Sequence, residues 1–136
     1  MIKKPSTFSF QIKEILNLLL KRCSITAIYH FGSSLGGKVH DESDIDIGVL
    51  FRKIPDAFEL LDIQEDLSGI AGQRVDLVVL NDASPILQMQ VIRNGKPVFI
   101  LDSKALDLFV LNSFSMYCDL KVSRLPVEES MLNKSN

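Results

Sequence analysis

Acidic residues in two hydrophobic segments are the residues of this chain best suited to chemistry. Asp44 and Asp46 stand at the start of Asp-Ile-Asp-Ile-Gly-Val-Leu-Phe, and Asp76 lies within Arg-Val-Asp-Leu-Val-Val-Leu. Because side chains alternate along a strand, Asp44 and Asp46 face one side and the apolar residues between them face the other. Carboxylates this close are costly to keep ionised without a cation, and Mg²⁺ takes one or two carboxylates together with phosphate oxygens. The acids therefore predict a metal site that serves a phosphate-bearing ligand.

A glycine-serine pair before the acids predicts a binding site for phosphate. Residues 25–31 are β-branched and aromatic, as is typical of a strand, and Gly32 and Ser33 follow them directly. Glycine permits a tight turn with close backbone approach. A serine that opens a short helix offers its hydroxyl and the free N–H groups of the first turn to an anion. One segment, His30 to Phe51, thus combines a predicted phosphate site with a predicted metal site.

Asp76 is expected to complete the acidic site. A charged side chain in so apolar a strand is costly unless it has a partner or binds a metal. If its strand pairs beside the strand that begins at Asp44 and Asp46, all three carboxylates can face one pocket. Plainer interpretations exist for each feature, because Asp-x-Asp and Gly-Ser are common in ordinary turns and Asp76 could pair with Arg74 or Lys96.

The remaining segments have the patterns of the elements that must position these residues. Apolar periodicity predicts helices at about 7–22, 56–68, 84–94 and 102–119, and strand patterns occur at 25–31, 45–51, 73–80 and 96–100. Gly69 is expected to stop the second helix, Ser84-Pro85 to begin the third, and Pro97 to place the last strand at a sheet edge. The last helix carries more apolar residues than one face needs. This surplus indicates either a surface for a partner or a helix packed between two layers.

Length and composition indicate one globular domain. The chain has 136 residues, of which 46% are hydrophobic and 24% charged, as expected for a single domain with its own core. We expect residues 1–120 to form the domain and the polar residues 121–136 to form a flexible tail. No apolar run reaches the roughly 20 residues of a membrane helix, and no signal-peptide pattern follows Met1, so the expected location is the cytoplasm.

Charge and the residues with reactive side chains exclude several other classes of function. The net charge is −2, which argues against direct binding of nucleic acid, because such binding needs Lys and Arg to neutralise phosphates. Cys23 and Cys118 lack the spacing of a zinc or redox pair and are expected to be buried free thiols. His30 is interpreted as a core-facing residue and His40 as a loop residue.

The order and spacing of these features resemble a known family. Gly32-Ser33, ten intervening residues and Asp44-x-Asp46, followed by Asp76 in a second strand, are similar to the signature of the DNA polymerase β-like nucleotidyltransferase superfamily. Within it the chain most resembles the minimal nucleotidyltransferase (MNT) antitoxins of HEPN/MNT toxin–antitoxin pairs, over about residues 10 to 101. The resemblance implies an α/β (α+β) fold, with a small mixed sheet and helices packed mainly on one face.

The resemblance also implies a role for each site residue. Asp44, Asp46 and Asp76 would be catalytic and would hold two Mg²⁺ ions, with ATP as substrate. The nucleotide-binding residues would be Gly32, Ser33, Ser34, Gly37 and Lys38. Family members usually carry basic residues in this turn, in a pattern like G-S-R-A-R-G, whereas this chain reads G-S-S-L-G-G. Gly37 matches the closing glycine, and Lys38 would supply part of the missing charge.

The implied reaction is transfer of AMP from ATP to a tyrosine of a partner, a HEPN-type RNase toxin. Two alternatives stay open from the sequence. One is a non-catalytic antitoxin that neutralises its partner by binding it. The other is a nucleotidyltransferase of small molecules such as aminoglycosides.

Overall fold

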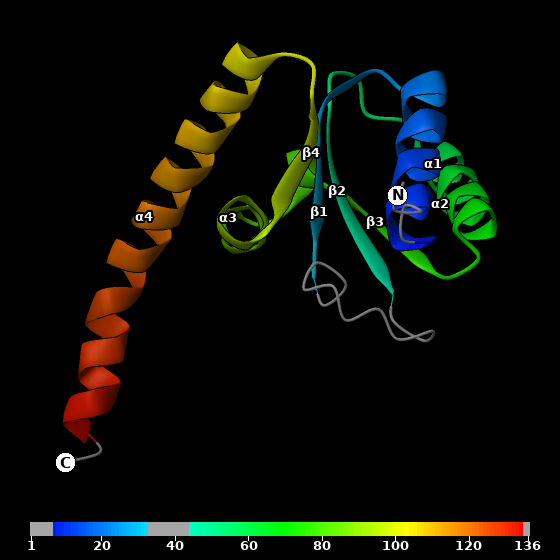
Figure 1. Ribbon diagram of the computed structural model, residues 1–136. Helices are drawn as coiled ribbons and strands as arrows, with labels where there is room; N and C mark the ends of the chain where they lie inside the picture. Colours follow the sequence, from blue (N-terminus) through cyan, green and yellow to red (C-terminus); the bar gives the residue numbers. More distant parts are fainter. Residues whose placement is uncertain (1–6, 33–43, 135–136) are drawn as a thin grey trace, which may run out of the picture.

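A four-stranded sheet lies between two pairs of helices (Figure 1). The structure, a computed structural model, describes residues 7–32 and 44–134 of the chain. The strands are β1 (Ile25–Phe31), β2 (Ile45–Phe51), β3 (Val75–Val79) and β4 (Lys96–Ile100). The helices are α1 (Thr7–Arg22), α2 (Ala57–Ala71), α3 (Pro85–Asn94) and α4 (Ser103–Lys134), with a short 3₁₀ turn at Leu80–Asp82. No helix within these described ranges is long and apolar enough to cross a membrane.

The sheet is mixed, with the strand order β3-β2-β1-β4. Strand β1 pairs antiparallel with β2 and with β4, whereas β2 and β3 run parallel. The parallel pair is joined through α2, as expected because parallel neighbours need a crossover connection. Strand β4 lies at one edge, so the prediction made from Pro97 is confirmed. The predicted mixed sheet is confirmed as well.

Helices cover both faces of the sheet, which corrects the expectation that they pack mainly on one. Helices α1 and α2 bury one face through a core that includes Ile15, Ile63 and the strand residues Ile28 and Ile47. The opposite face carries a second core, in which Tyr29 packs with residues of α3 and α4. The α4 sequence alone did not show this, because its apolar residues are not confined to one stripe.

The helix ends follow local capping chemistry at most positions. Ser84 accepts a hydrogen bond from the Leu87 N–H (3.2 Å) ahead of Pro85, and Asp102 accepts one from the Ala105 N–H (3.1 Å), as predicted.

Two predicted helix ends were wrong. Helix α2 passes through Gly69 and ends at Ala71.

The second misplaced end is that of α4, which continues to Lys134 instead of stopping near Asp119. It packs along α3 and then extends beyond it (Figure 1). The polar composition after residue 120 hid this continuation, because a sequence without a regular hydrophobic period gives no signal for a helix. The independent flexibility of residues 121–136 stays a prediction.

Two glycines, one inside α2 and one directly after it, give a matched test of where this helix ends. Gly72 is the residue after the helix and has φ +71°, a left-handed conformation. Gly69 lies inside the helix. A methyl group added at either glycine would meet nothing within 4 Å. We therefore expect Gly69→Ala to raise the free energy of unfolding by about 0.5–1 kcal/mol and Gly72→Ala to lower it by about 1 kcal/mol. Urea denaturation of both variants measures this. A Gly69→Ala protein that is less stable than the wild type, together with a Gly72→Ala protein that is more stable, would show that the helix stops at Gly69.

Candidate functional site at the Phe31–Asp46 end of the central strands

Two of the predicted acids face each other across the parallel pair of strands. Asp46 of β2 is the register partner of Asp76 of β3. Tyr29 of β1 and Leu50 of β2 belong to the core under α3 and α4, and alternation places Asp46 and Asp76 on that same face. Both carboxylates are half-buried. The sequence prediction that they share one face is therefore confirmed in its geometry.

Gly32 lies directly against the Asp46 carboxylate. Phe31, the last residue of β1, is the register partner of Asp46, and Gly32 follows with φ +85°. A Cβ atom at Gly32 would lie 2.8 Å from Asp46 Cγ and would overlap Oδ2. Only glycine fits this close approach, and its positive φ is a conformation that other residues adopt at a cost. The turn and the acids thus form one site.

The electrostatics of Asp46 show an excess of negative charge. Burial, then the charge of Asp76, and then the charge of Asp44 raise the pKa of Asp46 above its usual range. Asp44 stands one residue before β2 and is half-buried. A cation would offset the repulsion between these carboxylates. The site therefore has the charge that a metal ion requires.

Side chains of α2 hold the β3 edge in place beside the acids. Gln64 Oε1 accepts the Leu77 N–H at 3.1 Å, and Ser68 Oγ accepts the Val75 N–H at 2.9 Å. These amides flank Asp76 and lie on the outer edge of β3, where the described residues form no further strand. Sequence reasoning missed this role of Gln64 and Ser68. The only signal was two polar residues four positions apart beside an apolar stripe.

Asp76 also has a cationic partner in Arg74. Arg74 Nε donates to Asp76 Oδ1 at 3.1 Å, with 70% of the Arg74 side chain exposed. The ion pair that the sequence left open is therefore present. It does not exclude a metal role, because exposed pairs of this kind are weak and exchange easily.

The donor set suits a magnesium ion that shares its ligands with a nucleotide. Among the described residues no three His, Cys, Asp or Glu side chains gather closely enough to surround an ion. Asp46 and Asp76 supply carboxylate oxygens from adjacent strands, and Mg²⁺ takes its remaining ligands from phosphate oxygens and water. The catalytic and metal-binding roles of Asp44, Asp46 and Asp76 remain predictions.

Several other predicted residues fall outside the described ranges. Ser33, Ser34, Gly37 and Lys38 do so, and their nucleotide-binding roles also remain predictions. His30 is described and is 3% exposed. Burial and the nearby charge of Lys96 lower its pKa, in agreement with the core-facing interpretation.

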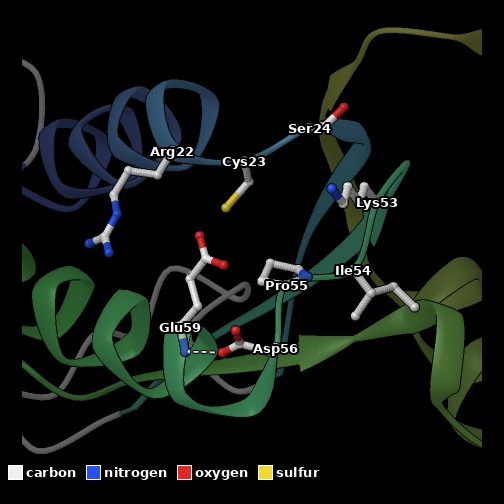
Figure 2. Close-up of a pocket in the computed structure, with 8 residues that line it drawn as sticks. All are labelled: Arg22, Cys23, Ser24, Lys53, Ile54, Pro55, Asp56 and Glu59. Carbon is white, nitrogen blue, oxygen red and sulfur yellow. Dashed lines mark hydrogen bonds between the residues drawn. The ribbon is translucent and has the colours of Figure 1, made fainter.

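A hollow at the opposite end of the sheet is a weaker candidate (Figure 2). Its lining residues precede β1 or follow β2 in the chain. They lie at the opposite end of the β1–β2 pair from Phe31 and Asp46. Asp56 caps α2 by accepting the Glu59 N–H at 2.8 Å, and Arg22 is paired with Asp66. Burial, followed by the charge of Glu59, raises the pKa of Cys23, which keeps the thiol protonated and unreactive. Asp56 and Arg22 thus have partners within the fold, and the thiol of Cys23 is unreactive.

Comparison with known proteins identifies close relatives. Residues 11–104 match the polymerase beta nucleotidyltransferase family. The chain is 33% identical over 105 residues to the protein adenylyltransferase MntA of Shewanella oneidensis, a match that covers 77% of this chain and 75% of the relative.

Solved structures give the same result. A toxin–antitoxin crystal structure with AMP-PNP matches with a TM-score of 0.78 and 31% identity, over 88% of this chain and 97% of the other. A complex of tri-AMPylated Shewanella oneidensis HEPN toxin with MNT antitoxin matches with a TM-score of 0.74 and 27% identity, over 90% and 97% of the two chains.

The raised pKa of Asp46 yields a stability test. Because the folded-state pKa lies above the unfolded value of about 3.9, stability is full at low pH and falls as pH rises through the folded-state pKa. We expect Asp46→Asn to raise the melting temperature at pH 7 in chelator, and this gain to shrink toward pH 4. The charged groups that raise the pKa of Asp46 are Asp76 and Asp44. Arg74 is paired with Asp76.

The control for this measurement is Asp62→Asn, which changes a carboxylate on the exposed side of α2. Its melting temperature should equal that of the wild type at both pH values. An Asp46→Asn protein that melts at or below the wild-type temperature at pH 7 would show that Asp46 carries no unfavourable charge.

Proposed function

This chain belongs to the polymerase beta nucleotidyltransferase family, and we propose that it transfers AMP from ATP to a partner protein of the HEPN toxin type, acting as an antitoxin. The observation that carries this proposal is the direct apposition of Asp46 and Asp76, with Gly32 against the Asp46 carboxylate. The relatives support the acceptor, because one is named a protein adenylyltransferase and another is a complex with an AMPylated HEPN toxin. The proposed place of the reaction is the cytoplasm, where ATP is present.

The proposed transfer forms one bond and breaks one. An acceptor hydroxyl, assigned to a tyrosine of the toxin, attacks the α-phosphorus, and the bond from that phosphorus to the bridging oxygen of pyrophosphate breaks. Asp76 receives the proton of the hydroxyl and passes it to water. Pyrophosphate leaves with the bond electrons.

The other site residues of the proposal bind and orient. Asp44 and Asp46 would hold two Mg²⁺ ions together with Asp76, and these ions would stabilise the charge that develops on the phosphate oxygens. Gly32 lets the backbone approach the phosphates closely, since it has no Cβ. Ser33, Ser34, Gly37 and Lys38 complete the proposed phosphate contacts.

The exposed face of α4 is the proposed docking surface for the toxin. Leu108, Leu111 and Phe114 are 69%, 65% and 52% exposed, and their spacing places them on a common side of the helix. Of the two interpretations left by the sequence, the described residues support an uncovered surface, because no second layer packs there. An apolar stripe of this kind commonly binds a partner. The toxin is the favoured occupant because relatives crystallise as toxin–antitoxin complexes.

A non-catalytic antitoxin is the second candidate function. The pairing of Arg74 with Asp76 favours it, because the guanidinium competes with a metal ion for that carboxylate. In this case the chain would neutralise the toxin by covering it. A protein with all three acids changed to Ala that still neutralises the toxin in cells would establish this alternative.

The catalytic proposal predicts that purified protein with ATP and Mg²⁺ adds the mass of AMP to its toxin. Asp46→Ala and Asp76→Ala should each lower the transfer rate at least about a hundredfold, because each removes a group that stabilises the transition state. Intact-protein mass spectrometry over time measures the rate. Asp62→Ala, away from the site, is the control and should transfer normally. Near wild-type transfer by either site variant contradicts the assignment.

The docking proposal predicts that Leu111→Glu weakens toxin binding at least about tenfold, because it places a charge in the centre of an apolar contact. Leu61→Glu is the matched control, since Leu61 is 59% exposed but lies on α2, in the layer across the sheet. Calorimetric titration of toxin into each variant measures the affinity. Equal weakening by both variants, or none by Leu111→Glu, argues against α4 as the docking surface.

A further inference from the structure

The pairing of Arg74 with Asp76 places a cation of the chain itself on a carboxylate of the proposed site. Two ion pairs form between described residues, Arg22–Asp66 and Arg74–Asp76, and only the second involves the acidic site. Asp76 keeps 32% of its side chain exposed, and the pair has a single contact at 3.1 Å through Nε. The terminal nitrogens of the guanidinium are thus left for other partners.

The backbone fixes Arg74 at the rim of the acids. Its carbonyl oxygen accepts the Ile45 N–H at 3.0 Å, in the β2 segment between Asp44 and Asp46. From that position the side chain reaches Asp76 and remains 70% exposed. An anion bound against the acids therefore lies within reach of the guanidinium, because its long stem can turn while its backbone stays fixed.

We propose that Arg74 is a positioning residue that exchanges partners during substrate binding. Without a bound cation, the guanidinium would neutralise Asp76. With Asp76 as a metal ligand, the guanidinium would instead bind phosphate oxygens of the nucleotide. Guanidinium suits this exchange because its planar fork pairs with carboxylates and with phosphates in the same geometry. The inference rests on the proposed function for the identity of the nucleotide.

The exchange links binding of metal and nucleotide. A metal ion that arrives alone competes with Arg74 for Asp76, whereas a metal ion that arrives with a nucleotide gives Arg74 a new partner. Each ligand therefore raises the affinity for the other, and the coupling is reciprocal. Removing the guanidinium should tighten binding of the metal alone and weaken binding of the nucleotide.

The test compares Arg74→Gln with Arg52→Gln, which removes an exposed arginine just past the far end of β2. Mn²⁺ binding without nucleotide is measured by electron paramagnetic resonance, and binding of α,β-methylene ATP with Mg²⁺ by calorimetry. We expect Arg74→Gln to bind Mn²⁺ about two- to fivefold more tightly and the nucleotide about tenfold more weakly. Arg52→Gln should match the wild type in both measurements.

A charge-retaining variant keeps the test independent of folding. Arg74→Lys should bind Mn²⁺ as the wild type does, and should bind the nucleotide with intermediate affinity because lysine lacks the fork. An Arg74→Gln protein with unchanged affinity for either Mn²⁺ or the nucleotide overturns the exchange. This differs from failure of the proposed function, in which the wild type would add no AMP to the toxin.

Discussion

Two like charges that face each other across neighbouring strands are the constraint on which the rest of this structure depends. The parallel register of β2 and β3 sets Asp46 opposite Asp76, and burial makes the repulsion between them stronger than in water. A fold selected only for stability would place apolar residues at such positions. The neighbouring elements keep these carboxylates in place, and both stay only half-buried.

Each neighbouring element contributes to holding that arrangement. Helices α1 and α2 bury the opposite face of the strands, so the acids can project only toward the α3 and α4 side. On the open edge, Gln64 and Ser68 bind the amides on either side of Asp76. At the far end, Asn81 donates to and accepts from the Phe51 backbone, both at 2.9 Å, in place of a further strand residue. Side chains thus replace missing strand partners at the β3 edge beside the site and at the far end of β2.

The same face of the sheet relates the site to the proposed partner surface. Helix α4 contributes Leu106 to the core beneath it while Leu108 and Leu111 face outward. A protein docked on that outward surface would lie on the side of the sheet from which the acids project. In the proposed reaction a protein acceptor brings its hydroxyl to the α-phosphorus. A docking surface on the same side of the sheet as the acids is consistent with this reaction.

Local sequence patterns determined the strands and most helix starts, because alternation and capping depend on neighbouring residues only. Gly32 could be placed in a turn for the same reason. Tertiary structure decided what depends on residues far apart in the chain: the Asp46–Asp76 register, the contact of Gly32 with Asp46, the support from Gln64 and Ser68, and the Arg74 ion pair that the sequence left open. It also decided that helices cover both faces, since one stretch of sequence does not show which face of a sheet its apolar residues will meet.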